Sequence, residues 1–209
     1  TLVWYRRHNA NTTLGLTSQI ASHAMIVAKH FGQDAGDPSG WPPHKRIAYA
    51  GYYRLRTTNL LRLGDITGCA VSLVRMLSIR PDWVDQNKWY EMILSSTVPR
   101  DHICEVHAVD LERSAALAHA VLEQLFTTQR SGRLARQRRK IYANMYWMLA
   151  RIAYWQGRIA QSREWFFRAI KEYLPIVLDT RRSYWIVRYL VGGVLRPVRQ
   201  RVWRLLLTR

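Results

Sequence analysis

The chain contains 209 residues, and its 32 lysines and arginines against 14 acidic residues give a formal net charge of +18. This length suits one domain or two small ones, and 48% hydrophobic residues with nine tryptophans supply enough apolar surface for a packed core, which excludes a wholly disordered protein. The longest apolar stretch, 185–195, is interrupted by Arg188 and is shorter than the ~18 uncharged residues of a spanning helix. The two cysteines cannot form a framework of disulfides and fit a reducing cytoplasm.

The positive charge is concentrated in the C-terminal part of the chain. Residues 1–129 carry 13 lysines and arginines against 11 acidic residues, whereas residues 130–209 carry 19 against three. Such a basic block attracts partners that bear phosphate, which means nucleic acid, anionic lipid headgroups or nucleotide sugars. Composition does not choose among these three.

In chain order, the first predicted element is a short edge strand at residues 1–6, which runs into a polar loop. Residues 14–31 carry apolar side chains at helical spacing, and Gly32 follows as a stop signal, so a helix is predicted there. Residues 32–43 hold three glycines and three prolines and predict a linker. The remainder, 44–209, reads mostly as helix.

The helical part contains an approximate internal repeat. Aligning Gly64 with Gly157 superposes residues 46–81 on residues 139–175, with the closing proline offset by one position. Each copy predicts a long aromatic-rich helix, a glycine turn and a second helix. Large, small and turn residues recur where tetratricopeptide repeats have them, namely Tyr146, Ala150, Ala153, Gly157, Ile159, Ser162, Phe166 and Ala169 in the second copy and Tyr53, Gly64, Ile66, Cys69, Leu73 and Pro81 in the first.

The first copy departs from this pattern at Arg56 and Thr57, so two unrelated amphipathic hairpins remain the alternative. Two more helices are predicted between the copies, at 86–96 and 111–129. The second of them has an apolar stripe made of Leu111, Ala115, Ala118, Leu122 and Leu125. Past Pro175, two short helices are predicted at 184–194 and 197–207.

Motifs for known chemistry are few. The sequence has no phosphate-binding GxxxxGK[ST], no GxGxxG after a strand and no GxSxG. His102, Cys104 and His107 lie close together, but a zinc site needs further ligands, so they are interpreted as loop residues. Asp82 follows Pro81 and is expected to cap a helix.

Two basic segments are candidate surfaces. The run at 130–140 could attract nucleic acid, but the aromatic residues after it lie at positions that the helical core claims, which disfavours base stacking. The segment 196–209 predicts a basic amphipathic helix for a membrane or partner surface, while a helix that caps the repeats is the alternative. Its candidate residues are Arg199, Arg201, Trp203 and Arg204.

The segment YRRHNANTT at 5–13 resembles the motif that closes the catalytic domain of bacterial family 2 glycosyltransferases, which are inverting GT-A enzymes. Matching residues are Tyr5, Arg6, His8, Asn11 and Thr13. The later phrases RLGDITGCAVSLVRMLSIRPDW, WYEMIL, LEQLF and ARIAYWQGRIAQSREWFFRAI are similar to helical hairpins that follow this domain in many members.

This resemblance implies that His8 coordinates a divalent metal, Mn²⁺ or Mg²⁺, and that Arg6, Arg7 and Asn11 hold the phosphates of a nucleotide sugar. The parent enzyme would transfer a sugar to a cell-surface glycan or a lipid-linked acceptor. The Asp-x-Asp motif, the nucleotide-binding strands and the catalytic base would all precede Thr1. This chain alone is therefore expected to be inactive and to bind no metal.

The sequence thus predicts a mainly α protein with antiparallel helical hairpins. Residues 1–31 would form the C-terminal end of a catalytic domain, and residues 32–43 would be a linker between the two domains. Residues 44–209 would form a repeat-like module that docks to a membrane or a protein partner. A stand-alone adaptor and, after it, a nucleic-acid-binding protein are the alternatives. The expected location is the cytoplasm, at the inner face of the plasma membrane.

Overall fold

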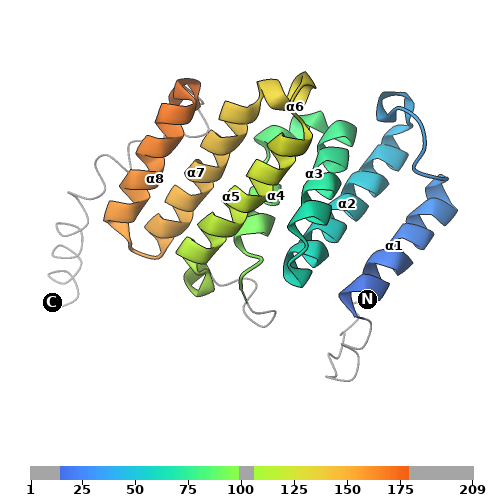
Figure 1. Cartoon of the computed structure of the whole chain (residues 1–209), viewed down its shortest axis with the longest axis horizontal. Helices are drawn as coiled ribbons and strands as arrows, with labels where there is room; N and C mark the ends of the chain where they lie inside the picture. Colours follow the sequence, from blue (N-terminus) through green and yellow to red (C-terminus); the bar gives the residue numbers. More distant parts are fainter. Residues whose placement is uncertain (1–14, 99–105, 179–209) are drawn as a thin grey trace, which may run out of the picture. The chain divides into compact units, whose positions relative to one another are not determined.

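A computed structural model describes residues 15–98 and 106–178 (Figure 1). Every regular element in these two ranges is a helix, which confirms the predicted mainly α class. The α-helices are α1 (Leu16–Phe31), α2 (Pro43–Leu63), α3 (Ile66–Ile79), α4 (Asn87–Leu94), α5 (Leu111–Thr128), α6 (Gly132–Arg136), α7 (Arg138–Trp155) and α8 (Ile159–Glu172). The 3₁₀ turns are η2 (Pro38–Gly40), η3 (Pro81–Asp85), η5 (Val106–Ala108) and η6 (Leu174–Leu178). The predicted strand at 1–6 and the predicted helices at 184–194 and 197–207 lie outside the described residues.

The chain divides into two compact units, and α4 and α5 contribute to both. Of the described residues, the first unit contains 15–89 and 120–129, and the second contains 90–98, 106–119 and 130–178. Within these described residues, no helix is both long and apolar enough to cross a membrane.

The first unit is built on the hairpin of α2 and α3. Gly64 ends α2 in the left-handed conformation, with φ of 77°, and the Asp65 carboxylate then caps α3 by accepting a 2.8 Å hydrogen bond from the Gly68 amide. The facing side chains form the core of the hairpin. Its fully buried members include Ala50, Cys69, Ala70, Leu73 and Met76.

The segment 32–43, predicted as a linker, is tied to α2 in this unit. Trp41 in the segment is only 8% exposed, although glycine and proline dominate its neighbours. Three side chains hold the segment's carbonyls, through hydrogen bonds from Trp41 Nε1 to Ala35, from Lys45 Nζ to Gln33 and from Tyr49 Oη to Gly32. The segment is therefore an ordered connection from α1 to α2.

The second unit contains the hairpin of α7 and α8. Residues 141–150 of α7 are all buried, and Gly157 turns the chain with φ of 80°. Across the hairpin, Ser162 Oγ donates a 2.8 Å hydrogen bond to the Ala150 carbonyl. The rings of Tyr146 and Trp165 stack with centroids 5.6 Å apart.

The two hairpins repeat one another at the level of the backbone. When Gly64 is aligned with Gly157, α3 and α8, each of 14 residues, begin and end at equivalent positions, and so do η3 and η6. The turn hydrogen bonds correspond one by one: Gly64 to Leu61, Asp65 to Leu60, Ile66 to Gly64 and Cys69 to Asp65 match Gly157 to Tyr154, Arg158 to Ala153, Ile159 to Gly157 and Ser162 to Arg158. The internal repeat is therefore a real feature of the fold.

The predicted helices at 14–31, 86–96 and 111–129 correspond to α1, α4 and α5, whose ends lie within two residues of the expected ones. The apolar stripe of α5 is confirmed, since Leu111, Ala115, Ala118, Leu122 and Leu125 are all at most 5% exposed. The helix predicted at 86–96 ends at Leu94, because the hydroxyls of Ser95 and Ser96 turn back to the carbonyls of Met92 and Ile93.

The predicted cap at Asp82 is wrong. The residue that caps η3 is Arg80, whose side chain makes no capping hydrogen bond, and Asp82 already lies inside the first turn. Its carboxylate instead accepts two hydrogen bonds from the Arg80 guanidinium, at 2.8 and 2.9 Å. The hydrogen bonds from Arg80, and to a smaller extent one from the backbone of Asp82 itself, outweigh burial and lower the pKa of this carboxyl group.

Candidate functional site

The site residues predicted from the sequence all lie outside the described part of the chain. They are Arg6, Arg7, His8 and Asn11 at one end and Arg199, Arg201, Trp203 and Arg204 at the other. His102 and Cys104 also lie outside it. Among residues 15–98 and 106–178, no three His, Cys, Asp or Glu side chains are grouped so that they could hold a metal ion.

Cys69 is a core residue and not a nucleophile. It is fully buried between α2 and α3, where the second copy of the hairpin has Ser162. Burial, and to a smaller extent the negative charge of Asp65, raises the pKa of its thiol to about 12. The thiolate that nucleophilic or redox chemistry needs is therefore nearly absent at neutral pH.

Asp34 is the centre of a polar cluster in the first unit. Its carboxylate accepts hydrogen bonds from the Arg75 guanidinium on α3 and from the Tyr53 hydroxyl on α2. Burial alone would raise the pKa of Asp34, but these two hydrogen bonds and the charges of Arg75 and Lys45 lower it overall. Burial, and then the hydrogen bond to Asp34, raises the pKa of Tyr53. At neutral pH the Asp34 carboxyl group is thus ionised and the Tyr53 phenol is protonated, which indicates that the cluster stabilises the fold and does not transfer protons.

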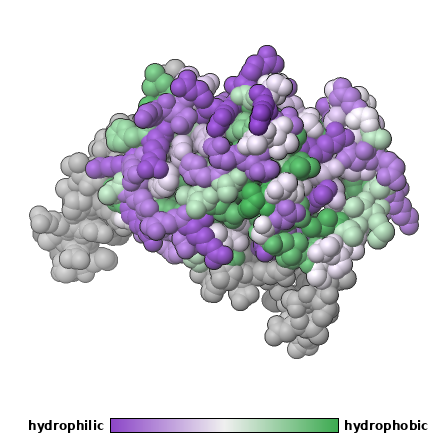
Figure 2. All heavy atoms as spheres, in the orientation of Figure 1, coloured by the Kyte–Doolittle hydropathy of each residue, from purple (hydrophilic) through white to green (hydrophobic). Residues whose placement is uncertain are grey.

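A basic segment, residues 130–140, includes α6 and the first turn of α7 in the second unit. No acidic residue occurs between Glu123 and Glu164, while nine lysines and arginines do. Five of these cations are exposed at the surface: Arg130, Arg133, Arg136, Arg138 and Arg139. Figure 2 shows that hydrophilic side chains cover most of the drawn face, including its upper edge around α6.

The cations at the start of α7 are not placed for helix stability, unlike Arg133 and Arg136 in the last turn of α6. Arg138, Arg139 and Lys140 occupy the first turn of α7, where the helix dipole is positive, and each cation there costs about 0.3–1 kcal/mol. The residue before the helix, Gln137, provides no side-chain cap. An anion bound at this end would offset both deficits. The segment is therefore a candidate surface for an anionic partner.

The three aromatic residues closest in sequence to the basic segment are not available for base stacking. Tyr142, Tyr146 and Trp147 are 6%, 9% and 2% exposed. The ring of Tyr142 lies 5.6 Å from the Arg138 guanidinium. The sequence-based expectation that the core claims the aromatic rings after the segment is confirmed for these three residues. It is wrong for Trp155 at the end of α7, which is 48% exposed.

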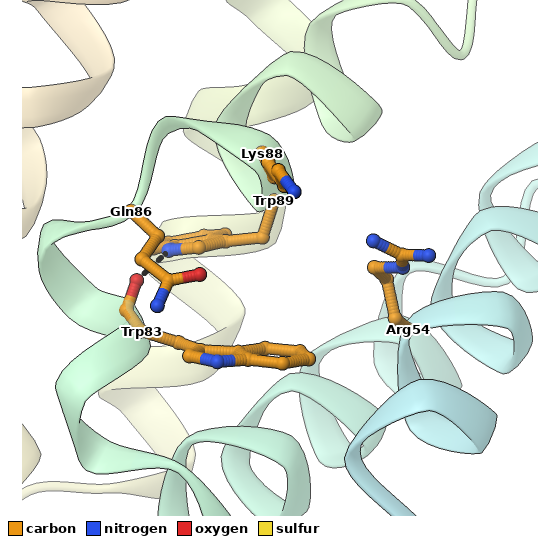
Figure 3. Close-up of a pocket in the computed structure, with 5 residues that line it drawn as sticks. All are labelled: Arg54, Trp83, Gln86, Lys88 and Trp89. Atoms are coloured by element: carbon orange, nitrogen blue, oxygen red, sulfur yellow. Dashed lines mark hydrogen bonds between the residues drawn. The ribbon is translucent and has the colours of Figure 1, made fainter. Parts of the chain in front are cut away.

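A small pocket lies in the first unit, where η3, the start of α4 and α2 meet (Figure 3). Its lining residues are Arg54, Trp83, Gln86, Lys88 and Trp89, and its volume is about 80 Å³. Sequence reasoning missed this site. The two tryptophans that flank polar residues in WVDQNKW are a visible signal, but Arg54 joins them only through the packing of α2.

Comparison with known proteins gives no relative: no family model matches the chain, and neither the curated proteins nor the solved structures contain a significant match.

Proposed function

We propose that the helical region is the docking module of a family 2 glycosyltransferase and that it holds the enzyme at an anionic membrane surface. The resemblance of residues 5–13 to the end of a GT-A domain supports the enzyme class. The repeated hairpins of α2–α3 and α7–α8 support a scaffold, because stacked helical hairpins present extended surfaces to partners. Their likeness to tetratricopeptide repeats is part of this proposal.

The observation that carries the proposal is the exposed basic segment of α6 and α7. Its five exposed arginines lie within ten residues, and no carboxylate lies near them in the sequence. Each Lys or Arg close to an anionic leaflet contributes about 1 kcal/mol of attraction. Five such residues are enough for measurable adsorption without an inserted anchor.

A membrane accounts for this segment better than nucleic acid does. Single-stranded nucleic acid is bound through aromatic side chains that stack on bases, and the rings closest in sequence to the segment are buried. Anionic headgroups require only accessible charge. The phosphates of a nucleic-acid duplex also require only accessible charge. Comparing the binding to vesicles with the binding to duplex DNA distinguishes these two partners.

The test is co-sedimentation of the full chain with vesicles of phosphatidylcholine and phosphatidylserine. We expect binding that depends on phosphatidylserine. It should fall roughly a thousandfold when Arg130, Arg133, Arg136 and Arg139 are all changed to Gln, because four cations at about 1 kcal/mol each are removed. A chain that lacks residues 196–209 measures the contribution of the predicted C-terminal helix separately.

The matched control changes the same number of exposed cations elsewhere, at Lys29, Arg113, Arg158 and Lys171, and should retain most of the binding. Equal losses in both variants would show that net charge alone acts and would contradict the proposal. Absence of vesicle binding would favour the stand-alone adaptor. Binding to duplex DNA that is stronger than binding to vesicles would favour the nucleic-acid alternative.

The enzyme class has its own test in the gene. We expect the reading frame to continue upstream of Thr1 for roughly 200 residues, which is the size of one domain. This upstream part should contain nucleotide-binding βαβ units and an Asp-x-Asp motif. There, His8 would join the carboxylates as a ligand of Mn²⁺ or Mg²⁺. An initiator Met directly before Thr1 would contradict this part of the proposal.

A further inference from the structure

We infer that the pocket formed by Arg54, Trp83, Gln86, Lys88 and Trp89 binds the phosphate group of a phosphate monoester, with the organic part of the ligand against Trp83. This site belongs to the first unit, whereas the basic segment of α6 and α7 belongs to the second. The inference therefore does not rest on membrane docking.

The pocket has aromatic walls and a polar rim. Figure 3 shows the indole rings of Trp83 and Trp89 on opposite sides of the space, with the Gln86 amide at one edge. Arg54 lines the pocket from α2, across from the two tryptophans. Trp89 is only 1% exposed, whereas Trp83 is half-buried and leaves part of its ring open to a ligand.

The charge of the pocket favours an anion. Two of its five lining residues are cationic, and none is a carboxylate. Among the described residues, neither Arg54 nor Lys88 forms an ion pair. The first turn of α4, which contains Lys88 and Trp89, adds the positive end of a helix dipole. Arg, Lys and an amide N–H are the donors that phosphate oxygens accept from.

The walls of the pocket are fixed before any ligand binds. The carbonyl of Trp83 accepts hydrogen bonds from the backbone N–H of Gln86 at 2.9 Å and from Trp89 Nε1 at 2.8 Å, which ties the start of α4 to η3. The Arg80 guanidinium lies 5.3 Å from the centroid of the Trp83 ring and is itself held by Asp82. The two aromatic walls are thus held in place, whereas the exposed side chains of Arg54, Gln86 and Lys88 must still be ordered by the ligand.

The size of the pocket selects the class of ligand. A volume of about 80 Å³ holds a few water molecules or one tetrahedral oxyanion, and it cannot enclose a nucleoside. A phosphate group would therefore enter, and the group esterified to it would remain at the mouth. The open part of the Trp83 ring offers that group an apolar contact.

The experiment is isothermal titration calorimetry of the full chain with two probes, inorganic phosphate and phenyl phosphate. We expect saturable binding of both, with phenyl phosphate the tighter. Arg54→Gln and Lys88→Gln should each weaken both probes by at least about tenfold, since each removes a charge-assisted hydrogen bond. Trp83→Leu should remove the advantage of phenyl phosphate and leave the binding of phosphate almost unchanged.

Arg113→Gln and Lys29→Gln, which remove exposed cations outside the pocket, are the matched controls and should bind as the parent chain does. Circular dichroism melting of each variant excludes loss of fold. The inference is overturned if neither probe binds with a dissociation constant below about 10 mM. It is also overturned if the double variant Arg54→Gln, Lys88→Gln binds the probes as tightly as the unmodified chain does. Equal affinities for the two probes would overturn the monoester class and leave a site for free phosphate. The pocket substitutions Arg54→Gln and Lys88→Gln should leave binding to vesicles unchanged.

Discussion

At the scale of the residue, Asp34 decides how firmly the segment 32–43 is held. Its side chain is 22% exposed and is paired with Arg75 and hydrogen-bonded to Tyr53. Asp34→Asn keeps the size of the side chain but leaves the guanidinium facing a neutral amide. We expect the free energy of unfolding to fall by about 1–2 kcal/mol in urea titrations at pH 7.

The pH dependence of that loss follows from the lowered pKa of Asp34. The folded value lies below the ordinary value of 3.8, because the hydrogen bonds from Arg75 and Tyr53 and the charges of Arg75 and Lys45 outweigh the opposing effect of burial. The stabilisation is therefore complete above the unfolded pKa and is lost as the pH falls through the folded one. The difference between the parent chain and Asp34→Asn should be constant from about pH 5 to 8 and shrink below about pH 4. Glu112→Gln, an exposed control on α5, should show little difference, and a gap that widens on acidification would contradict the assignment.

Cys69 gives a prediction about reactivity. With a thiol pKa of about 12, roughly one molecule in ten thousand carries the thiolate at pH 8. We expect iodoacetamide to leave Cys69 unmodified in the native chain and to alkylate it fully in guanidinium chloride, as measured by peptide mass spectrometry. Native labelling at the unfolded rate would show that α2 and α3 do not bury it.

At the scale of the element, Gly51 inside α2 and Gly64 directly after it should respond to alanine in opposite directions. Gly64 has φ of 77° and nothing within 4 Å of an added Cβ, so Gly64→Ala costs only the left-handed backbone, about 1–2 kcal/mol. Gly51 lies inside α2 with equally free space, and Gly51→Ala should stabilise the chain by about 0.5–1 kcal/mol. Thermal melting measures both. A loss of stability in both variants would indicate crowding that the structure does not contain.

The same elements show what the sequence could predict. The hairpins and their glycine turns were predictable because helical periodicity and a left-handed stop are local features. The ordering of 32–43 was not, because Tyr49 and Arg75, which hold it, come from helices further along the chain. The pocket was missed for the same reason, since Arg54 meets Trp83 only after α2 and η3 pack.

At the scale of the whole molecule, the net charge of +18 is a property of one part of the sequence. The acidic residues of 1–129 nearly balance its cations, and some are paired within the fold, as Asp34 is with Arg75 and Asp82 with Arg80. From 124 to 163 the chain has no acidic residue at all, and the exposed arginines of α6 and α7 lie in this stretch. The exposed arginines of the basic segment should therefore contribute to the contact with the partner that this charge attracts.

The dependence of vesicle binding on salt concentration distinguishes electrostatic attraction by the arginines from insertion of apolar side chains into the bilayer. The Debye length falls from about 10 Å in 0.1 M salt to about 3 Å in 1 M salt, so adsorption through exposed arginines should weaken steeply over that range, while contacts through buried apolar groups would persist. We expect the full chain to leave phosphatidylserine vesicles as NaCl rises, with no change in its circular dichroism. The variant with Gln at 130, 133, 136 and 139 should show a shallower dependence on salt, and the control with the same net charge should keep the steep one. Binding by the full chain that survives 1 M NaCl would mean that an apolar surface, and not these arginines, holds the protein at the bilayer.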